Sequence, residues 1–340
     1  SLADYKKDRA IAIILSGTGS DGTRGVKAIK EADGMVMVQD PEQAKFDGMP
    51  KSAINSGMVD YILPVEEMGS EINRFIEASE AIQLNGELEN YDEQVLTKIL
   101  DYINENTGLD FSEYKFSTLA RRVARRVNVC KCETFKEYYR LLQTNPDEVS
   151  ILFKEFLIGV TKFFRDPRVW EILSDDLIPE IIERKDDGET LKVWDVACST
   201  GEEAYSLAMY INEELRKQNK DLKVKIFATD IAKQHLEIGG NGVYSESTIA
   251  DIDTELVKKY FIKHSDGYQV VEKIRRMVIF SQHNIIKNPP FSNMDMILCR
   301  NLLIYFQQSI QHKTLNVLHY ALKENGFLIL GTSETVNSHR

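Results

Sequence analysis

Between residues 193 and 330, short apolar runs alternate with segments of helical periodicity, and this alternation constrains the fold more than any other feature of the chain. The runs are typical of buried strands and comprise Val193–Ala197, Ile226–Thr229, Val278–Ser281, Met294–Cys299 and Phe327–Leu330. Strands joined by helices form parallel sheets, because a helical crossover returns the chain to the same end of the sheet. The pattern predicts an α/β, doubly wound, Rossmann-like domain over residues 166–340.

Two smaller regions precede this domain. Residues 1–66 are expected to form a partial parallel α/β segment, with strands at Ile11–Ser16, Met35–Val38 and Val59–Leu63 and helices at Thr23–Glu31 and near Met49–Ser56. An amphipathic helix from about Val65 to Ala78 and the polar stretch QLNGELEN predict a helix and a linker over residues 67–90. Residues 91–165 show apolar side chains at three- and four-residue spacing, which predicts a small all-helical domain.

The composition narrows the class of protein. A chain of 340 residues, 43% hydrophobic and 28% charged, is long enough for two or three cores, and none of its apolar runs approaches the length of a membrane span. We expect a cytoplasmic protein with no direct membrane insertion. The net charge of −11 disfavours broad nucleic-acid binding. The four cysteines are predicted to be reduced thiols, with no metal site, because their spacing fits neither zinc ligands nor a disulfide framework.

Two strand ends carry the features of a nucleotide-like site. The strand at Val193 runs through the small-residue turn Ala197-Cys-Ser-Thr-Gly201 into a helix, whose N-terminal N–H groups are free to bind a ligand. The strand at Ile226 ends in Asp230, where a carboxylate can accept hydrogen bonds from ribose hydroxyls.

Six ordered motifs carry a closer resemblance: Thr161-Lys-Phe-Phe-Arg-Asp166, Ser199-Thr-Gly-Glu-Glu-Ala-Tyr-Ser206, Ala228-Thr-Asp230, His283-Asn284, Cys299-Arg-Asn-Leu-Leu-Ile-Tyr-Phe306 and Gly331-Thr-Ser-Glu334. Over residues 91–334 the chain resembles the bacterial chemotaxis receptor methyltransferases, the CheR family. The resemblance implies a protein-glutamate O-methyltransferase that uses S-adenosylmethionine and releases S-adenosylhomocysteine. Its partner would be a methyl-accepting chemotaxis receptor.

The resemblance also implies roles for single residues. Asp230 would hold the ribose of the donor, and Asn284 with Ile285 would border the adenine. The other donor-binding residues would be Thr161, Arg165, Ala197, Glu203, Arg300 and Asn301. A glutamate carboxylate is already ionised near neutral pH and needs no general base, so positioning should dominate catalysis. Arg165 and Tyr305 are the candidates for orienting that carboxylate.

Structural interpretations of these residues stay open at this stage. Asp230 could be a helix N-cap, and Glu203 could be an acid that favours the dipole of its helix. Tyr305 could be a core aromatic, and Gly159 departs from an asparagine found in relatives. A non-catalytic module that binds the donor is the alternative function. A methyltransferase for nucleic acid or small molecules is a third, since Asn288-Pro-Pro-Phe291 imitates an N-methylation motif but precedes its strand.

The segment Leu119–Val127 (LARRVARRV) places four arginines in two rows beside an apolar stripe. In CheR relatives the corresponding helix faces the receptor, so Arg121, Arg122, Arg125 and Arg126 are predicted to guide an acidic receptor helix. An ordinary solvated helix face is the alternative. The loop Asp266–Arg276, where some relatives hold a receptor's tail peptide, has one glycine and is not expected to do so.

Residues Leu15–Arg24 and Phe46–Ile54 resemble the C-terminal part of the chemotaxis receptor methylesterases, the CheB family. Asp21 matches the aspartate of the esterase triad, but the segment has no histidine and no nucleophile elbow, so esterase activity is not expected here. We interpret the chain as a piece of a CheB/CheR fusion, truncated at both ends. A missing closing strand pair would leave an open sheet edge through which the chain could self-associate.

Overall fold

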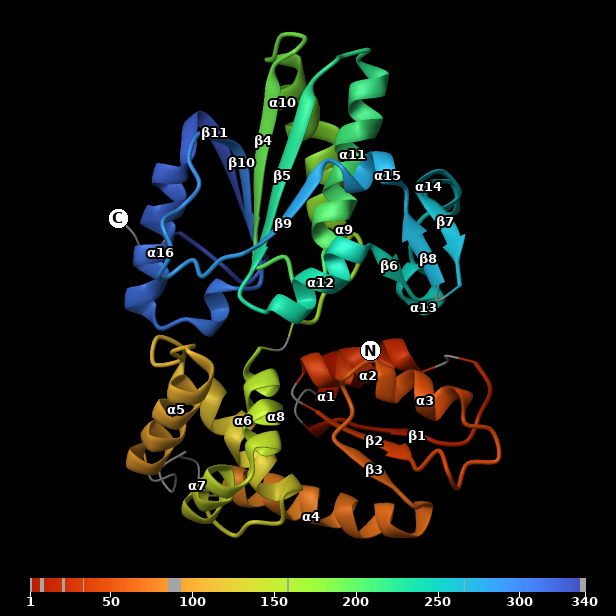
Figure 1. Ribbon diagram of the computed structural model, residues 1–340, viewed down its shortest axis with the longest axis vertical. Coiled ribbons are helices and arrows are strands. Elements are labelled where there is room, and N and C mark those ends of the chain that lie inside the picture. Colours follow the sequence, from red (N-terminus) through yellow and green to blue (C-terminus); the bar gives the residue numbers. More distant parts are fainter. Residues whose placement is uncertain are drawn as a thin grey trace. The chain divides into compact units, whose positions relative to one another are not determined.

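The computed structural model describes residues 2–6, 9–19, 22–32, 34–84, 93–157, 159–265 and 267–336. The chain divides into two compact units, Ser1–Ile158 and Gly159–Arg340, each described here by itself (Figure 1). Residues 159–165, which the sequence analysis assigned to the helical domain, thus belong to the second unit. No helix in the described part of the chain has the length and apolarity needed to cross a membrane.

The first unit begins with a three-stranded parallel sheet of order β1-β2-β3. Its elements are α1 (Leu2–Lys6), β1 (Ile11–Ile14), α2 (Thr23–Glu31), β2 (Met35–Gln39), α3 (Gly48–Asn55), β3 (Tyr61–Leu63) and α4 (Val65–Leu84). The central strand β2 is apolar and buried from Met35 to Val38, as a strand between two neighbours must be. The expected strands and helices are confirmed, and α4 extends six residues beyond the predicted end at Ala78. The predicted linker falls largely on residues 85–90, outside the described part.

Four helices follow: α5 (Glu93–Thr107), α6 (Phe116–Val129), α7 (Phe135–Thr144) and α8 (Pro146–Phe156). Their boundaries have local causes. The hydroxyl of Thr134 accepts a hydrogen bond from Glu137 N (3.2 Å) at the start of α7, and Asn145 caps α8 just before Pro146. The apolar stripes meet in one core that includes Leu96, Val123 and Leu152. The all-helical prediction is confirmed.

The second unit is built on a five-stranded, wholly parallel sheet of order β11-β10-β4-β5-β9. These strands are β4 (Thr190–Val196), β5 (Lys223–Asp230), β9 (Val278–Gln282), β10 (Met294–Cys299) and β11 (Leu322–Leu330). The helices that accompany them are α9 (Pro167–Ile172), α10 (Ile178–Glu183), α11 (Glu202–Lys217), α12 (Lys233–Asn241), α15 (Glu272–Arg275) and α16 (Gln308–Ala321), with a π-helix at Leu173–Leu177 and a 3-10 helix at Leu303–Tyr305. The doubly wound prediction is confirmed, and β11 forms one edge of the described sheet.

A second, antiparallel sheet in this unit was not predicted. Its strands β6 (Val243–Tyr244), β7 (Phe261–His264) and β8 (Gly267–Val270) pair in the order β6-β8-β7, alongside α13 (Glu246–Ile249) and α14 (Thr254–Tyr260). Strands of two to four residues are too short to show periodicity in the sequence. The predicted loop Asp266–Arg276 is therefore largely regular structure, because Gly267–Val270 form β8, which pairs with β7, and Glu272–Arg275 form α15.

All four cysteines are free, as expected from their spacing. Cys198 and Cys299 are buried beside the main sheet, and burial raises the pKa of both thiols well above the usual range. Neither thiol is therefore a ready nucleophile.

Candidate functional site

The strand order of the main sheet fixes where a ligand site can form. From the central strand β4 the chain winds outward through β5 and β9, and then returns to β10 on the other side of β4. The crevice at such a reversal lies beyond the carboxyl ends of the two strands that flank it. Ala197 follows β4 and Arg300 follows β10, so two predicted donor-binding residues stand at this point.

The loop between β4 and α11 has an unusual backbone. Ala197, Ser199 and Gly201 all have positive φ values, of 59°, 50° and 90°. Such values are uncommon for residues with a side chain, and they concentrate at functional sites where surrounding structure maintains them. The loop leads directly to the N-terminus of α11, where helix N–H groups lack intrahelical partners.

Asp230 links this loop to the end of β5. Its buried carboxylate accepts hydrogen bonds from Ser199 N (2.9 Å) and from Ala232 N (2.8 Å). Helix α12 starts at Lys233 with Ala232 as its N-cap, so Asp230 is not the cap residue of that helix. A contact to a ribose stays a prediction.

Arg300 joins three of the sequence motifs. Its side chain is 1% exposed, and its guanidinium pairs with the carboxylate of Glu203 on α11 and with Asp166 Oδ2 (2.7 Å). It also donates to the backbone oxygen of Arg165 (2.9 Å). Asp166 and Glu203 lie 134 and 97 residues from Arg300 in the sequence, and their segments are thereby fixed at the carboxyl end of β10.

A buried acid that the sequence analysis missed lies next to this cluster. Asp195 on β4 is 0% exposed. No backbone, hydroxyl or basic donor on the described residues reaches its carboxyl oxygens, and its hydrogen-bonding neighbour is the carboxyl group of Glu203. Burial, and then the charge of Glu203, raise the pKa of Asp195 well above its usual range. Burial likewise raises the pKa of Glu203, although Arg300 and Arg165 act in the opposite direction. Asp195 precedes the small-residue turn by two positions. This position in the sequence was the signal that could have identified it as a site residue.

Glu334 supports the loop after β10. Its carboxylate accepts hydrogen bonds from four backbone N–H groups, at distances from 2.7 to 3.0 Å: those of Asn301, Leu302, Leu303 and Gly331. Asn301 itself has a φ of 58°. The last motif of the sequence therefore has a structural function, because it holds the residues that follow Arg300 in place.

The remaining predicted residues lie in the same unit. Thr161 and Tyr305 are half-buried, and Ile285 is buried. The side-chain oxygen of Asn284 accepts from Ile286 N (2.9 Å) and stabilises a turn. This turn is connected to the site because His283 N donates to the backbone oxygen of Asp230 (3.0 Å). The donor contacts of these residues stay predictions.

Gly159 is tightly enclosed. A Cβ atom there would lie 2.4 Å from Ser199 Oγ and 2.6 Å from His235 Cε1, and Ser199 Oγ donates to the backbone oxygen of Gly159 (2.8 Å). A side chain at this position therefore requires the loop after β4 to move.

The four arginines of α6 do not form the exposed surface that the sequence analysis expected. Arg126 makes a two-pronged ion pair with Glu148, with both N···O distances at 2.8 Å, and Tyr138 also donates to Glu148. Arg122 donates to the backbone oxygens of Glu155 and Phe156.

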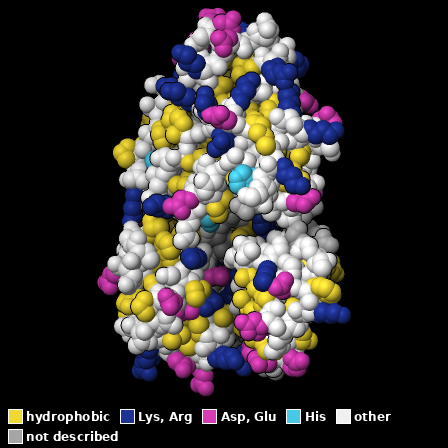
Figure 2. Space-filling model, turned by 45° about the vertical axis from the view of Figure 1, so that its right-hand side comes forward, with side chains coloured by type: hydrophobic (Ala, Val, Ile, Leu, Met, Phe, Trp, Pro, Cys, Tyr) yellow, Lys and Arg dark blue, Asp and Glu magenta, His cyan; other side chains and the backbone are white. Residues whose placement is uncertain are grey.

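Arg122 and Arg126 are each 8% exposed, while Arg125 pairs with Asp60. Of the four arginines, only Arg121 is exposed. The expectation of a four-arginine surface was wrong because helical periodicity does not reveal which neighbouring helix covers a polar row. Basic and acidic side chains are interspersed on the face drawn in Figure 2. Asp21, the aspartate of the esterase-like segment, lies outside the described residues.

The comparisons with known proteins agree with this organisation. The family model of the CheR methyltransferase SAM-binding domain matches residues 159–340, that of the CheR all-alpha domain matches residues 94–157, and that of the CheB methylesterase matches residues 1–72. The fold and the site thus define an S-adenosylmethionine-dependent methyltransferase class. The chain belongs to the CheR methyltransferase family, with a CheB-like segment before it.

Individual relatives show the same division. An uncharacterized 104.1 kDa protein from Rhodobacter capsulatus is 35% identical over 99% of the chain, which spans only 38% of that protein. A chemotaxis protein methyltransferase from Borreliella burgdorferi is 29% identical, with coverage of 74% of this chain and 91% of the relative. Among solved structures, the Thermotoga maritima CheB methylesterase catalytic domain is 40% identical over 22% of the chain, with a TM-score of 0.20.

Proposed function

We propose that the chain transfers the methyl group of S-adenosylmethionine to glutamate side chains of a methyl-accepting chemotaxis receptor. The observation that carries this proposal is the junction made by Arg300 with Glu203 and Asp166 at the reversal point of the sheet. This junction brings together the segments that, according to the family resemblance, bind the methyl donor. Relatives named chemotaxis protein methyltransferase support the substrate class.

The residues present suit a polar, charged ligand. In the described part of the chain, the Nε of Arg300 is buried without a hydrogen-bond partner, and Asp195 is buried with the carboxyl group of Glu203 beside it and no basic or backbone donor. Such groups are costly unless something pairs with them. Asp230 would hold the ribose, while Glu203 and the backbone of the loop after β4 would hold the methionine end. When bound, S-adenosylmethionine supplies an electrophilic methyl group on a sulfonium.

The protein's remaining tasks are orientation and exclusion of water. A substrate glutamate has an ordinary pKa near 4.3 and attacks as the carboxylate, so no side chain has to remove a proton. Arg165 and Tyr305 can each donate a hydrogen bond to one carboxylate oxygen and direct the other toward the methyl group. Holding two reactants in line in this way is a large source of rate acceleration.

The test is incubation of the full chain with radiolabelled S-adenosylmethionine and receptor membranes. We expect methyl groups that mild alkali releases as methanol, as glutamyl esters do. Tyr305→Phe should lower transfer by about 10- to 100-fold, the value of a hydrogen bond to a charged group, while binding of S-adenosylhomocysteine stays unchanged. Tyr320→Phe, at an 81% exposed tyrosine of α16, is the matched control and should have no effect.

Two outcomes would contradict the proposal. Methyl groups that survive alkali would indicate N-methylation of another substrate. Binding of S-adenosylmethionine with no transfer to any receptor preparation would favour a non-catalytic donor-binding module.

A further inference from the structure

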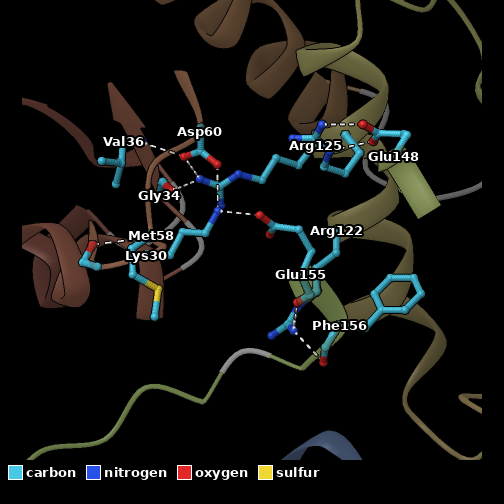
Figure 3. Close-up of polar contacts among 12 residues, drawn as sticks. Lys30, Gly34, Val36, Met58, Asp60, Arg122, Arg125, Glu148, Glu155 and Phe156 are labelled. Atoms are coloured by element: carbon cyan, nitrogen blue, oxygen red, sulfur yellow. Dashed lines mark hydrogen bonds and ion pairs between the residues drawn. The ribbon is translucent and has the colours of Figure 1, made fainter. Parts of the chain in front are cut away.

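Four charged side chains form a buried row within the first unit (Figure 3). Lys30 Nζ lies 2.7 Å from Asp60 Oδ1 and 3.0 Å from Glu155 Oε1, and Arg125 pairs with the other carboxylate oxygen of Asp60. The side chains of Lys30 and Asp60 are 2% and 1% exposed, and those of Glu155 and Arg125 are 13% and 14% exposed. The row alternates in sign and has no net charge.

Two different parts of the chain supply this row. Lys30 on α2 and Asp60 just before β3 come from the esterase-like segment, whereas Arg125 on α6 and Glu155 on α8 come from the helical domain. Lys30 therefore pairs with an acid of the helical domain, Glu155, and Asp60 pairs with a base of that domain, Arg125. The sequence separations of 125 residues for Lys30–Glu155 and 65 for Arg125–Asp60 exclude a local origin.

Backbone contacts fix the same boundary. Arg125 donates to the carbonyl oxygen of Gly34 (2.7 Å), in the turn before β2. The carboxylate of Asp60, which pairs with Arg125, also accepts a hydrogen bond from Val36 N in β2 (2.8 Å). This hydrogen bond ties Asp60 to the sheet. Burial by itself would raise the pKa of Asp60, but Arg125 and Lys30 outweigh it and lower that pKa, so the row is charged. Buried charges with this degree of pairing indicate a specific interface, because removing one partner leaves an uncompensated charge.

We propose that Arg125 on α6 and Glu155 on α8 form a docking surface for the esterase-like segment of the same chain. This inference concerns a surface that the proposed methyl transfer does not use. Arg122 and Arg126, the two buried arginines of α6, have their partners within the helical domain: Arg122 donates to Glu155 O, and Arg126 pairs with Glu148. Within the first unit, the helical domain therefore binds the esterase-like segment through this ionic row.

Amide hydrogen exchange on the full chain tests the docking. Arg125→Met and Asp60→Asn should each accelerate exchange in β2, β3 and α6 by about 100-fold, in keeping with the effect of breaking a buried ion pair. The double variant should be less disruptive than the sum of the two single variants, because Arg125 and Asp60 share one ion pair, although each also has a separate contact, to Gly34 O and to Lys30. Lys98→Met, at an exposed lysine of α5 in the same helical domain, is the matched control and should leave exchange unchanged.

A milder variant keeps the test decisive if these substitutions unfold the unit. Glu155→Gln removes one terminal charge of the row with little change in shape, and it should accelerate exchange in α2 and α8. Unchanged exchange in both Arg125→Met and Glu155→Gln would overturn the proposal. So would a tenfold rise in the KM for receptor membranes in Arg125→Met with normal exchange. If the native chain methylates no receptor, the proposed function fails, but the exchange result still decides the docking.

Discussion

The guanidinium of Arg300 lies 2.7 Å from the carboxylate of Asp166, and the same group pairs with Glu203. One cation buried at the end of β10 thus satisfies two acids from distant segments. Loss of Arg300 would leave the carboxylate of Glu203, whose side chain is 12% exposed, without its ion-pair partner.

Arg300→Met should destabilise the second unit by about 3–5 kcal/mol, because Glu203 and Asp166 would lose a buried partner. Chemical denaturation of the full chain measures this. Arg184→Met is the control, since Arg184 forms an exposed pair with Glu180 one helical turn away and should change stability by less than about 1 kcal/mol. Equal effects of the two variants would show that the Arg300 junction contributes little to stability.

Glu334→Gln should weaken binding of S-adenosylhomocysteine and lower stability by about 1–3 kcal/mol. The amide has one acceptor oxygen where the carboxylate has two, so some of the four backbone N–H groups lose their partner. Titration calorimetry and thermal unfolding report the two effects. Glu324→Gln, at an exposed glutamate in β11, should be neutral. Full donor affinity in Glu334→Gln would mean that the loop after β10 keeps its conformation without this carboxylate.

Gly159→Asn should reduce donor affinity by roughly 10-fold or more, because the new side chain displaces Ser199 in the loop after β4 and His235 in α12. The comparison variant is Gly240→Ala in α12, where an added methyl group meets nothing within 4 Å. That change should be neutral or stabilising by about 0.5–1 kcal/mol. An asparagine at position 159 that tightens donor binding would contradict the crowding seen here.

The pH dependence of the free energy of unfolding should reveal the raised pKa of Asp195. Its pKa in the folded chain is raised, so the folded state retains a proton that the unfolded state loses near the ordinary value of about 3.9. The stability from this group is fully present below about pH 4 and is lost as the pH rises through the higher folded-state value. Asp195→Asn should reduce that decline, leaving the part due to Glu203, and stabilise the ligand-free chain above about pH 4. Denaturation curves between pH 4 and pH 8 measure it, and parallel profiles for the two proteins would disprove the assignment.

The amino-acid sequence by itself determined the elements with strong local signals. Helix α2 and strand β10 have the predicted bounds, because a helical or apolar pattern of that length admits few alternatives. The order of strands and helices also determined the doubly wound topology, since right-handed crossovers leave few ways to build a parallel sheet.

Only the tertiary structure decided which polar groups meet. The sequence places Arg122 and Arg125 side by side with equal prospects of exposure, but their partners Glu155 and Asp60 lie 33 and 65 residues away. The short strands β6, β7 and β8 acquire their structure from one another. Asp195 becomes notable only because packing places it next to Glu203 without a donor. Charge pairing and burial depend on contacts between distant segments, and a pattern of neighbouring residues carries no record of them.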